Sequence, residues 1–218
     1  MEEQRAGYTN EIIAVFGHRG SGKTTWLMQN IESFQPFLLV DPLYDPKFRA
    51  LGLYSITSMD EAFDLFKNGD PKRCYITPNL ETFNIFCGLC LAKGNITLIV
   101  DEVDQFSTSQ YMPPHFKEAI KMGRHVGVNI IAACRRPHEM NPLIRSQANR
   151  FIIFPMGGED CKDLTSYIKD IMGMVMNLKS GDGFTEYIDY DFRKKTANVL
   201  SINYPKIILD NSINTEYD

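Results

Sequence analysis

The chain has 218 residues, of which 44% are hydrophobic and 23% are charged, and these proportions suit a folded domain with a sizeable core. Its formal net charge of −4 excludes a protein coated in basic residues for nucleic acid. No apolar run in the sequence reaches the roughly 18 residues of a membrane span, and the N-terminus MEEQRAGYTNE is too polar and acidic for a signal peptide. We therefore expect a soluble, intracellular protein.

Short apolar strands alternate with helical segments through the first 155 residues. Strands are predicted at residues 10–17, 37–41, 73–78, 95–102, 128–134 and 150–155. Helices are predicted between them at residues 21–34, 58–69, 80–94 and 113–126. This alternation predicts an α/β fold with a mostly parallel central sheet flanked by helices.

The pattern changes after Pro155. Residues 157–182 suggest a helix followed by a glycine-rich turn, and two strands of alternating polarity then flank DFRKK. We expect a small C-terminal helix plus an antiparallel hairpin, packed on the core, and a loose tail at LDNSINTEYD. The expected domains are a core over residues 1–155 and this extension over residues 156–218.

The five cysteines are an odd number and lie scattered along the chain, which favours a reducing compartment over a disulfide framework. Cys87 and Cys90 form one C-x-x-C, but a zinc site needs a second ligand pair, and the sequence has none at a suitable spacing. Because the pair lies in the apolar stretch ETFNIFCGLCLAK, we expect two buried thiols.

The first predicted strand leads directly into GHRGSGKT, which matches every fixed position of the phosphate-binding pattern G-x-x-x-x-G-K-[ST]. Glycines let backbone N–H groups converge on phosphate oxygens, and the helix that follows directs its positive end at the same anion. Lys23 is expected to reach the β- and γ-phosphates, and Thr24 to ligate Mg²⁺. The residues predicted to bind ATP are Gly17, His18, Arg19, Gly20, Ser21, Gly22, Lys23, Thr24 and Thr25.

Two adjacent carboxylates follow the predicted strand in NITLIVDE. Asp101 ends the strand and is expected to hold Mg²⁺ together with Thr24, directly or through the water shell of the ion. Glu102 is expected to orient or activate the attacking water. The sequence therefore predicts hydrolysis of ATP. Asp41, at the end of FLLVD, either supports the nucleotide site or caps a turn, and both interpretations stay open.

The acidic average hides a basic window at residues 115–150, where seven lysines and arginines against two glutamates give a net charge of +5. A solvated face and a basic surface on one side of an acidic molecule are both compatible with this window. Its cations are Lys117, Lys121, Arg124, Arg135, Arg136, Arg145 and Arg150.

Four stretches together resemble the FtsK–HerA superfamily of ring-forming, DNA-translocating ATPases: GHRGSGKT, LIVDEVDQF, GRHVGVNIIAACRRP and RFIIF. The resemblance covers about residues 11–155. The short chain is most similar to the viral genome-packaging ATPases of internal-membrane icosahedral viruses, such as those of archaeal turreted icosahedral viruses. The resemblance implies a RecA/FtsK-like P-loop ATPase core and the cofactors ATP and Mg²⁺. It also implies a homo-oligomeric ring, which we expect to be a hexamer.

Such a ring would move double-stranded DNA into a preformed capsid, in the host cytoplasm or attached to the virion, with a viral capsid or membrane vertex protein as a further partner. In such a ring, the cations Lys117, Lys121, Arg136 and Arg145 are candidates for contacts with the phosphate backbone of DNA.

The resemblance also gives roles to two arginines. Arg124 lies three residues before the glycine that opens the sensor strand, and it is expected to act in trans on the nucleotide of the neighbouring subunit. Arg150 is the competing candidate. Arg135 occupies the usual place of a sensor glutamine, where it brings a permanent charge. It is expected to contact the γ-phosphate or to pair with Glu102, as a sensor in its own subunit. The predicted catalytic residues are Lys23, Glu102, Arg124 and Arg135.

Three other functions agree less well with the sequence. A HerA-like translocase or helicase usually has an extra N-terminal barrel, whereas the nucleotide-binding strand here is predicted from about residue 11. An assembly ATPase of the filamentous-phage type would have a transmembrane segment. A small nucleotide or metabolite kinase would need an arginine-bearing lid, and the Asp-Glu pair argues against it.

Overall fold

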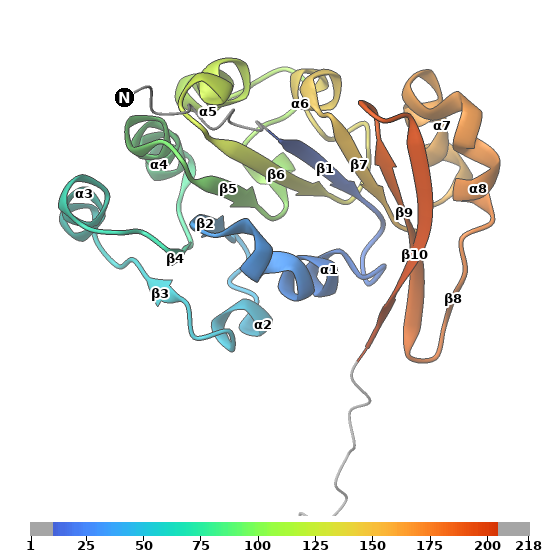
Figure 1. The fold of residues 1–218 in the computed structure, drawn as a ribbon, viewed down its shortest axis with the longest axis horizontal. Coiled ribbons are helices and arrows are strands. Elements are labelled where there is room, and N and C mark those ends of the chain that lie inside the picture. The colour runs from blue at the N-terminus through green and yellow to red at the C-terminus, as the bar shows by residue number, and fades with distance from the viewer. Residues whose placement is uncertain (1–10, 205–218) are drawn as a thin grey trace, which may run out of the picture.

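A computed structural model describes residues 11–204 (Figure 1). The expected loose tail and the polar N-terminal segment up to residue 10 lie outside the described residues. The described chain forms a ten-stranded sheet in the order β10-β9-β7-β1-β6-β5-β2-β4-β3, with β8 beside β9. All strands from β1 to β7 pair in parallel, which confirms the predicted parallel core.

The strands follow the apolar runs of the sequence closely. They are β1 Ile12–Phe16, β2 Phe37–Val40, β3 Tyr54–Ser55, β4 Arg73–Ile76, β5 Thr97–Val100, β6 Asn129–Cys134, β7 Arg150–Ile153, β8 Ser180–Gly181, β9 Phe184–Asp191 and β10 Thr196–Asn203. The very short strands β3 and β8 were not predicted, because two residues are too few to show an alternation of apolar and polar side chains.

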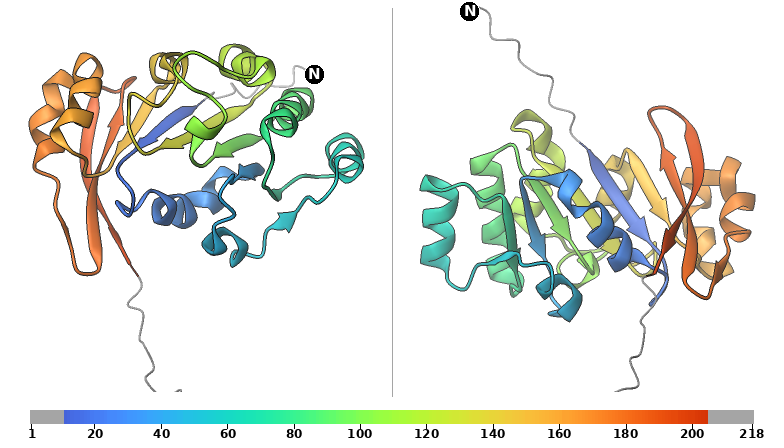
Figure 2. Two further views of the ribbon diagram at one scale, coloured as in Figure 1. Left: turned by 180° about the vertical axis from the view of Figure 1, so that it is seen from behind. Right: turned by 60° about the horizontal axis from the view of Figure 1, so that its bottom comes forward.

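Helices cover both faces of this sheet. They are α1 Lys23–Asn30, α2 Pro46–Arg49, α3 Met59–Asn68, α4 Leu80–Lys93, α5 Pro114–Met122, α6 Pro142–Gln147, α7 Gly158–Ile168 and α8 Met172–Met176. In Figure 1, α4, α5 and α6 lie above the sheet and α1 and α2 below it; Figure 2 shows the same layers from behind and from below. None of the helices within residues 11–204 is long and apolar enough to cross a membrane.

Two predicted helices end differently from the expectation. The segment 21–34 divides into α1 and the 3-10 helix η1 Ile31–Phe34, and the segment 113–126 ends in the 3-10 helix η3 Gly123–His125. The short helices α2 and α6 were not predicted, although each has a proline at its first position and an Asx residue that caps it.

Strand β1 lies in the middle of the sheet and separates two cores. Ile12, Ala14 and Phe16 face the core between the sheet and helices α4 to α7. Ile13 and Val15 face the second core, between the sheet and helices α1 and α2. This period-2 division lets every residue of the strand be buried, as expected for a central parallel strand. Cys87 and Cys90 are fully buried in α4, as predicted, and burial raises the pKa of both thiols.

The extension continues the same sheet. Strand β9 pairs antiparallel with β7, and β10 pairs antiparallel with β9, so the predicted hairpin is present and forms one edge of the sheet. Arg150 joins the two parts: its Nε donates to Asp189 Oδ1 at 2.6 Å and its Nη1 to Glu11 Oε1 at 3.3 Å. The division into two domains at residue 155 stays a prediction. The backbone hydrogen bonds between β7 and β9 join residues on the two sides of that boundary.

The Arg150–Asp189 pair is expected to stabilise the fold. Arg150→Ala should lower the free energy of unfolding by about 1–3 kcal/mol, because Asp189 is largely buried and loses its charged hydrogen bonds. Thermal denaturation would measure this as a fall in Tm of roughly 2–4 °C per kcal/mol. Lys194→Ala removes an exposed lysine that pairs with the partly buried Asp191, and it should change the free energy by less than about 0.5 kcal/mol. Equal Tm values for both variants would contradict this role.

Candidate functional site

The loop between β1 and α1, here called the phosphate loop (residues 17–24), depends on its glycines. Gly17 has φ +156°, and a side chain there would lie 2.6 Å from Phe154 Cβ and collide with Ser21 Oγ. Gly22, with φ +111°, is the residue before α1. Both positions therefore require glycine, and the loop turns tightly enough to present its backbone N–H groups ahead of the helix.

Lys23 lies folded into this loop. Its Nζ donates to Gly17 O at 2.7 Å, and the side chain is 6% exposed. Burial lowers the pKa of Lys23, while the nearby carboxylates of Glu102 and Asp101 oppose the shift. A buried ammonium group held among carbonyl oxygens is a suitable partner for an anion.

The sheet order brings the other predicted groups to the same place. Strands β1, β6 and β5 are neighbours and parallel, so their carboxyl ends lie along one edge of the sheet, here called the carboxyl edge. The phosphate loop follows β1, Arg135 follows β6, and Asp101 and Glu102 follow β5. This edge is where ligands bind in open α/β sheets.

Asp101 is buried, and its Oδ1 accepts a hydrogen bond from the backbone N–H of Glu102 at 3.1 Å. Burial raises the pKa of Asp101 to about 7, the charge of Glu102 adds to the rise, and Lys23 counteracts it. A buried carboxylate with this much unfavourable charge around it is a strong ligand for a cation.

Glu102 has a strained backbone with φ +47° and ψ 55°, in the left-handed region that few residues other than glycine adopt. Its Oε1 accepts a hydrogen bond from Arg135 Nε at 3.0 Å. Its Oε2 is buried and has no hydrogen-bond partner among the described residues. The carboxylate is therefore fixed through one oxygen and leaves the other to bind a group that is not part of the chain.

These groups fit a nucleotide with Mg²⁺. Ser21 Oγ in the phosphate loop is a second buried polar atom that lacks a partner within the described part of the chain. Unpaired buried polar atoms are costly, and two of them beside a lysine and a buried carboxylate indicate a site built for a polar ligand. Thr24 and Asp101 supply the oxygens that Mg²⁺ prefers.

Two predicted arginines lie away from this edge. Arg124 belongs to η3, which precedes β6, so it lies at the opposite, amino edge of the parallel strands. Its Nε donates to His125 Nε2 at 3.2 Å. Arg150 also begins a strand at the amino edge, and its guanidinium is occupied by Asp189 and Glu11. Within one chain, neither arginine reaches the phosphate loop.

Asp41 ends β2 at the carboxyl edge. Its carboxylate accepts the backbone N–H groups of Leu43, at 3.0 Å, and of Asp45, and also the hydroxyl of Tyr75 at 3.1 Å. Of the two interpretations left open for Asp41, these contacts favour the cap of a turn.

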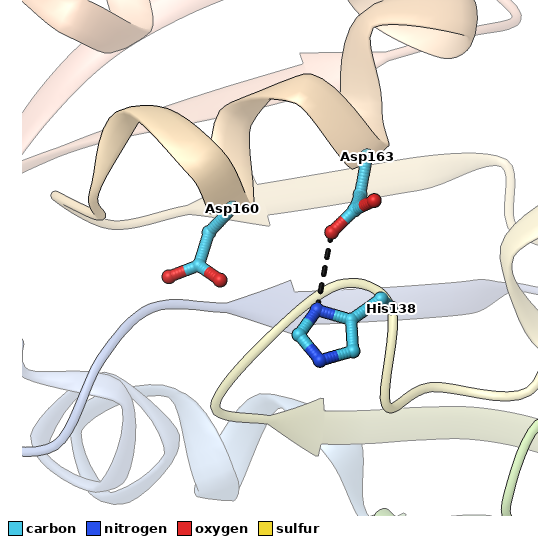
Figure 3. A group of neighbouring side chains, drawn as sticks. All are labelled: His138, Asp160 and Asp163. Carbon is cyan, nitrogen blue, oxygen red and sulfur yellow. Dashed lines mark hydrogen bonds and ion pairs between the residues drawn. The ribbon is translucent and has the colours of Figure 1, made fainter.

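The loop after Arg135 contacts the extension. Figure 3 shows His138 of this loop facing Asp160 and Asp163 on α7. His138 Nδ1 is 3.1 Å from Asp163 Oδ2, and Arg136 Nε is 4.0 Å from Asp160 Oδ1. These polar contacts join the end of β6 to α7.

Sequence reasoning missed two residues beside the phosphate loop. Ile202 and Tyr204, at the end of β10, lie against Gly22. Only the alternating polarity of β10 indicated that this segment would pack on the core, and no motif connected it with the loop.

Comparisons with known proteins now place the fold. No protein-family model matches the chain. The genome packaging NTPase B204 of Sulfolobus turreted icosahedral virus 2, solved in complex with ATPγS, superimposes with a TM-score of 0.69 at 20% sequence identity, over 90% of this chain and 98% of B204. The chain has the fold of B204.

The B204-like fold confirms the predicted P-loop NTPase architecture. VirB4 of Thermoanaerobacter pseudethanolicus is a more distant match, with a TM-score of 0.63 at 10% identity over 94% of this chain and 92% of VirB4. In sequence, Protein P9 of Pseudoalteromonas phage PM2 is 27% identical over an alignment of 142 residues that covers 62% of this chain. The chain spans just under two thirds of P9, 64% of its length.

Proposed function

We propose that this chain is an ATPase that packages a viral genome by moving double-stranded DNA into a preformed capsid. The observation that carries the proposal is the meeting of the phosphate loop, Asp101, Glu102 and Arg135 at the carboxyl edge of a B204-like sheet. B204 is a genome packaging NTPase that binds ATPγS. The proposed cofactors are ATP and Mg²⁺, and the proposed partners are double-stranded DNA and a capsid or membrane vertex protein.

The phosphates of ATP bind to the backbone N–H groups of the phosphate loop and to Lys23. Thr24 and Asp101 would hold Mg²⁺, and the ion would supply positive charge that offsets the charge of the phosphates. Glu102 orients the attacking water through Oε2 and takes up its proton. Arg135 donates to Oε1 and so fixes the orientation of this carboxylate. In this mechanism Arg135 acts on Glu102, the second of the two roles expected for it.

Arg124 supplies the remaining positive charge from a neighbouring copy. Because Arg124 lies at the amino edge and the phosphate loop at the carboxyl edge, the two meet only when copies associate head to tail. Such association produces a ring, proposed to be a hexamer, in which each nucleotide lies at a contact between subunits. The proposed working place of this ring is the host cytoplasm or the virion.

The DNA-binding part of the proposal rests on the exposed cations of the basic window. Lys117 and Lys121 on α5 and Arg136 after β6 are exposed, and Arg145 on α6 is partly exposed. Contacts with phosphates do not depend on base sequence and weaken steeply as salt is raised.

An ATPase assay with and without linear double-stranded DNA tests the proposed function. The expected result is hydrolysis that DNA stimulates at low salt and that loses this stimulation as salt is raised. Hydrolysis that DNA leaves unchanged at every salt concentration would refute translocation. Phosphate transfer from ATP to a small acceptor in place of water would support the kinase alternative.

Removing Arg135 is expected to slow hydrolysis. In the presence of DNA, Arg135→Ala should lower kcat about 10- to 100-fold and change KM for ATP much less, because Glu102 loses the group that orients it. Phosphate release at saturating ATP measures the effect. Arg49→Ala, which removes an exposed arginine of α2, should keep kcat within about twofold. Wild-type hydrolysis by Arg135→Ala with DNA present would exclude the assigned role.

A further inference from the structure

The end of β10 contacts the phosphate loop at the residue before α1. A Cβ atom built on Gly22 would lie 2.5 Å from Ile202 Cδ1 and 2.9 Å from the hydroxyl of Tyr204. No side chain fits in this space, so the backbone of Gly22 packs directly on the two side chains. Gly22 immediately precedes Lys23, and its φ of +111° needs support from its surroundings.

Both contacting side chains are themselves held in place. Ile202 is 3% exposed in the core that also contains Trp26 and Leu27 of α1. The hydroxyl of Tyr204 is 2.8 Å from Thr185 Oγ1, and Thr185 is buried in β9. The Tyr204 ring therefore cannot swing away from Gly22 without breaking a partly buried hydrogen bond.

The hairpin also contacts α1 beyond its first residue. Gln29 Nε2 near the end of α1 donates to Asn203 O at 3.1 Å, and Trp26 of α1 and Tyr187 of β9 belong to the same buried cluster. The extension therefore contacts the start of α1 at Gly22 and its end at Gln29. A displacement of β10 would shift the helix whose N-terminus receives the phosphates.

We propose that Tyr204 and Ile202 are positioning residues for the nucleotide. They fix the backbone at Gly22 and so preset the N–H groups at the start of α1 in the geometry that binds phosphate. A loop of glycines loses much conformational freedom when it closes on a ligand, and prior ordering by the hairpin removes part of that cost. The inference rests on the proposed nucleotide site and makes the C-terminal extension a part of it.

The test removes one hydroxyl from the full chain. Tyr204→Phe removes the hydroxyl that lies against Gly22 and bonds Thr185, and we expect the Kd for ATPγS and the KM for ATP to rise about fivefold. Because neither residue touches the reacting atoms, kcat at saturating ATP should change less than about twofold. Thr185→Val removes only the other partner of the same bond and should also raise Kd, and the double variant should bind no more weakly than Tyr204→Phe alone.

A tyrosine of the same hairpin provides the matched control. Tyr190 in β9 faces the opposite core, and its hydroxyl lies 3.5 Å from Asp170 Oδ2. Tyr190→Phe should leave the Kd for ATPγS unchanged. If Tyr204→Phe binds ATPγS like the wild type, or if Tyr190→Phe weakens binding as much, the positioning role is refuted.

Lys23→Ala separates this inference from the proposed function. Undiminished ATPγS binding by Lys23→Ala would refute the nucleotide site itself, and the inference with it. Loss of binding in Lys23→Ala together with wild-type binding in Tyr204→Phe would refute only the role of the hairpin. Loss of binding in the first and a fivefold rise of Kd in the second would support both.

Discussion

Glu102→Gln is expected to reduce ATP hydrolysis at least about 100-fold while ATP binding persists, since general-base catalysis contributes about 10²- to 10⁴-fold. The amide has the shape of the carboxylate, and its oxygen can still accept the hydrogen bond from Arg135. It cannot take up a proton from water. Phosphate release should therefore nearly stop, whereas the Kd for ATPγS should stay within a few-fold of the wild-type value.

Glu81→Gln is the matched control for this variant. Glu81 is an exposed glutamate in the first turn of α4, and its replacement should keep hydrolysis within about twofold. If Glu102→Gln hydrolyses ATP at more than a tenth of the wild-type rate, another group activates the water, and Glu102 would have only a structural role at the end of β5.

Arg124→Ala is expected to lower kcat about 1,000-fold or more, as arginines that act from a neighbouring subunit do. The six residues of β6 separate the two edges of the sheet, a span of about 20 Å at 3.3 Å per residue. An arginine side chain cannot cover that distance, so Arg124 cannot serve the phosphate loop of its own chain. Its effect on hydrolysis must come from association.

Mixing variants tests this directly. Lys23→Ala lacks its own nucleotide site but retains Arg124, and Arg124→Ala is the reverse. Each should be inactive alone, and a mixture should regain part of the activity, because some contacts combine an intact loop with an intact arginine. His125→Ala removes the side chain that accepts a hydrogen bond from Arg124 in its own chain and should stay active. The absence of any recovery in the mixture would exclude a trans role.

Features that depend on residues close together in the sequence could be predicted from the sequence alone. The spacing in GHRGSGKT located the phosphate loop, and continuous apolar runs located β1, β5 and β6 within a residue or two. Alternation of strands and helices predicted the parallel sheet because such a sheet needs crossovers of this length. Predicting Asp101 and Glu102 required only that the strand be recognised and that it end where its apolar residues end.

Contacts between distant segments were not predictable in the same way. Pairing with Glu102 was one of two roles expected for Arg135, and the sequence left the choice open because the register of β5 beside β6 is not specified by a single sequence. The occupation of Arg150 by Asp189 depends on β9 joining the sheet beside β7. Tyr204 could not be connected with Gly22 from the sequence because the two lie at opposite ends of the chain.

Because Arg124 and the phosphate loop lie on opposite edges of the sheet, the number of complete nucleotide sites depends on whether the assembly is open or closed. If a row of copies is open, its last member has a loop that no arginine reaches, so the row always contains one complete site fewer than its number of chains. Closing the row adds a whole site without adding a chain. The contact that closes the ring therefore completes the last nucleotide site, and only a closed ring has as many complete sites as chains.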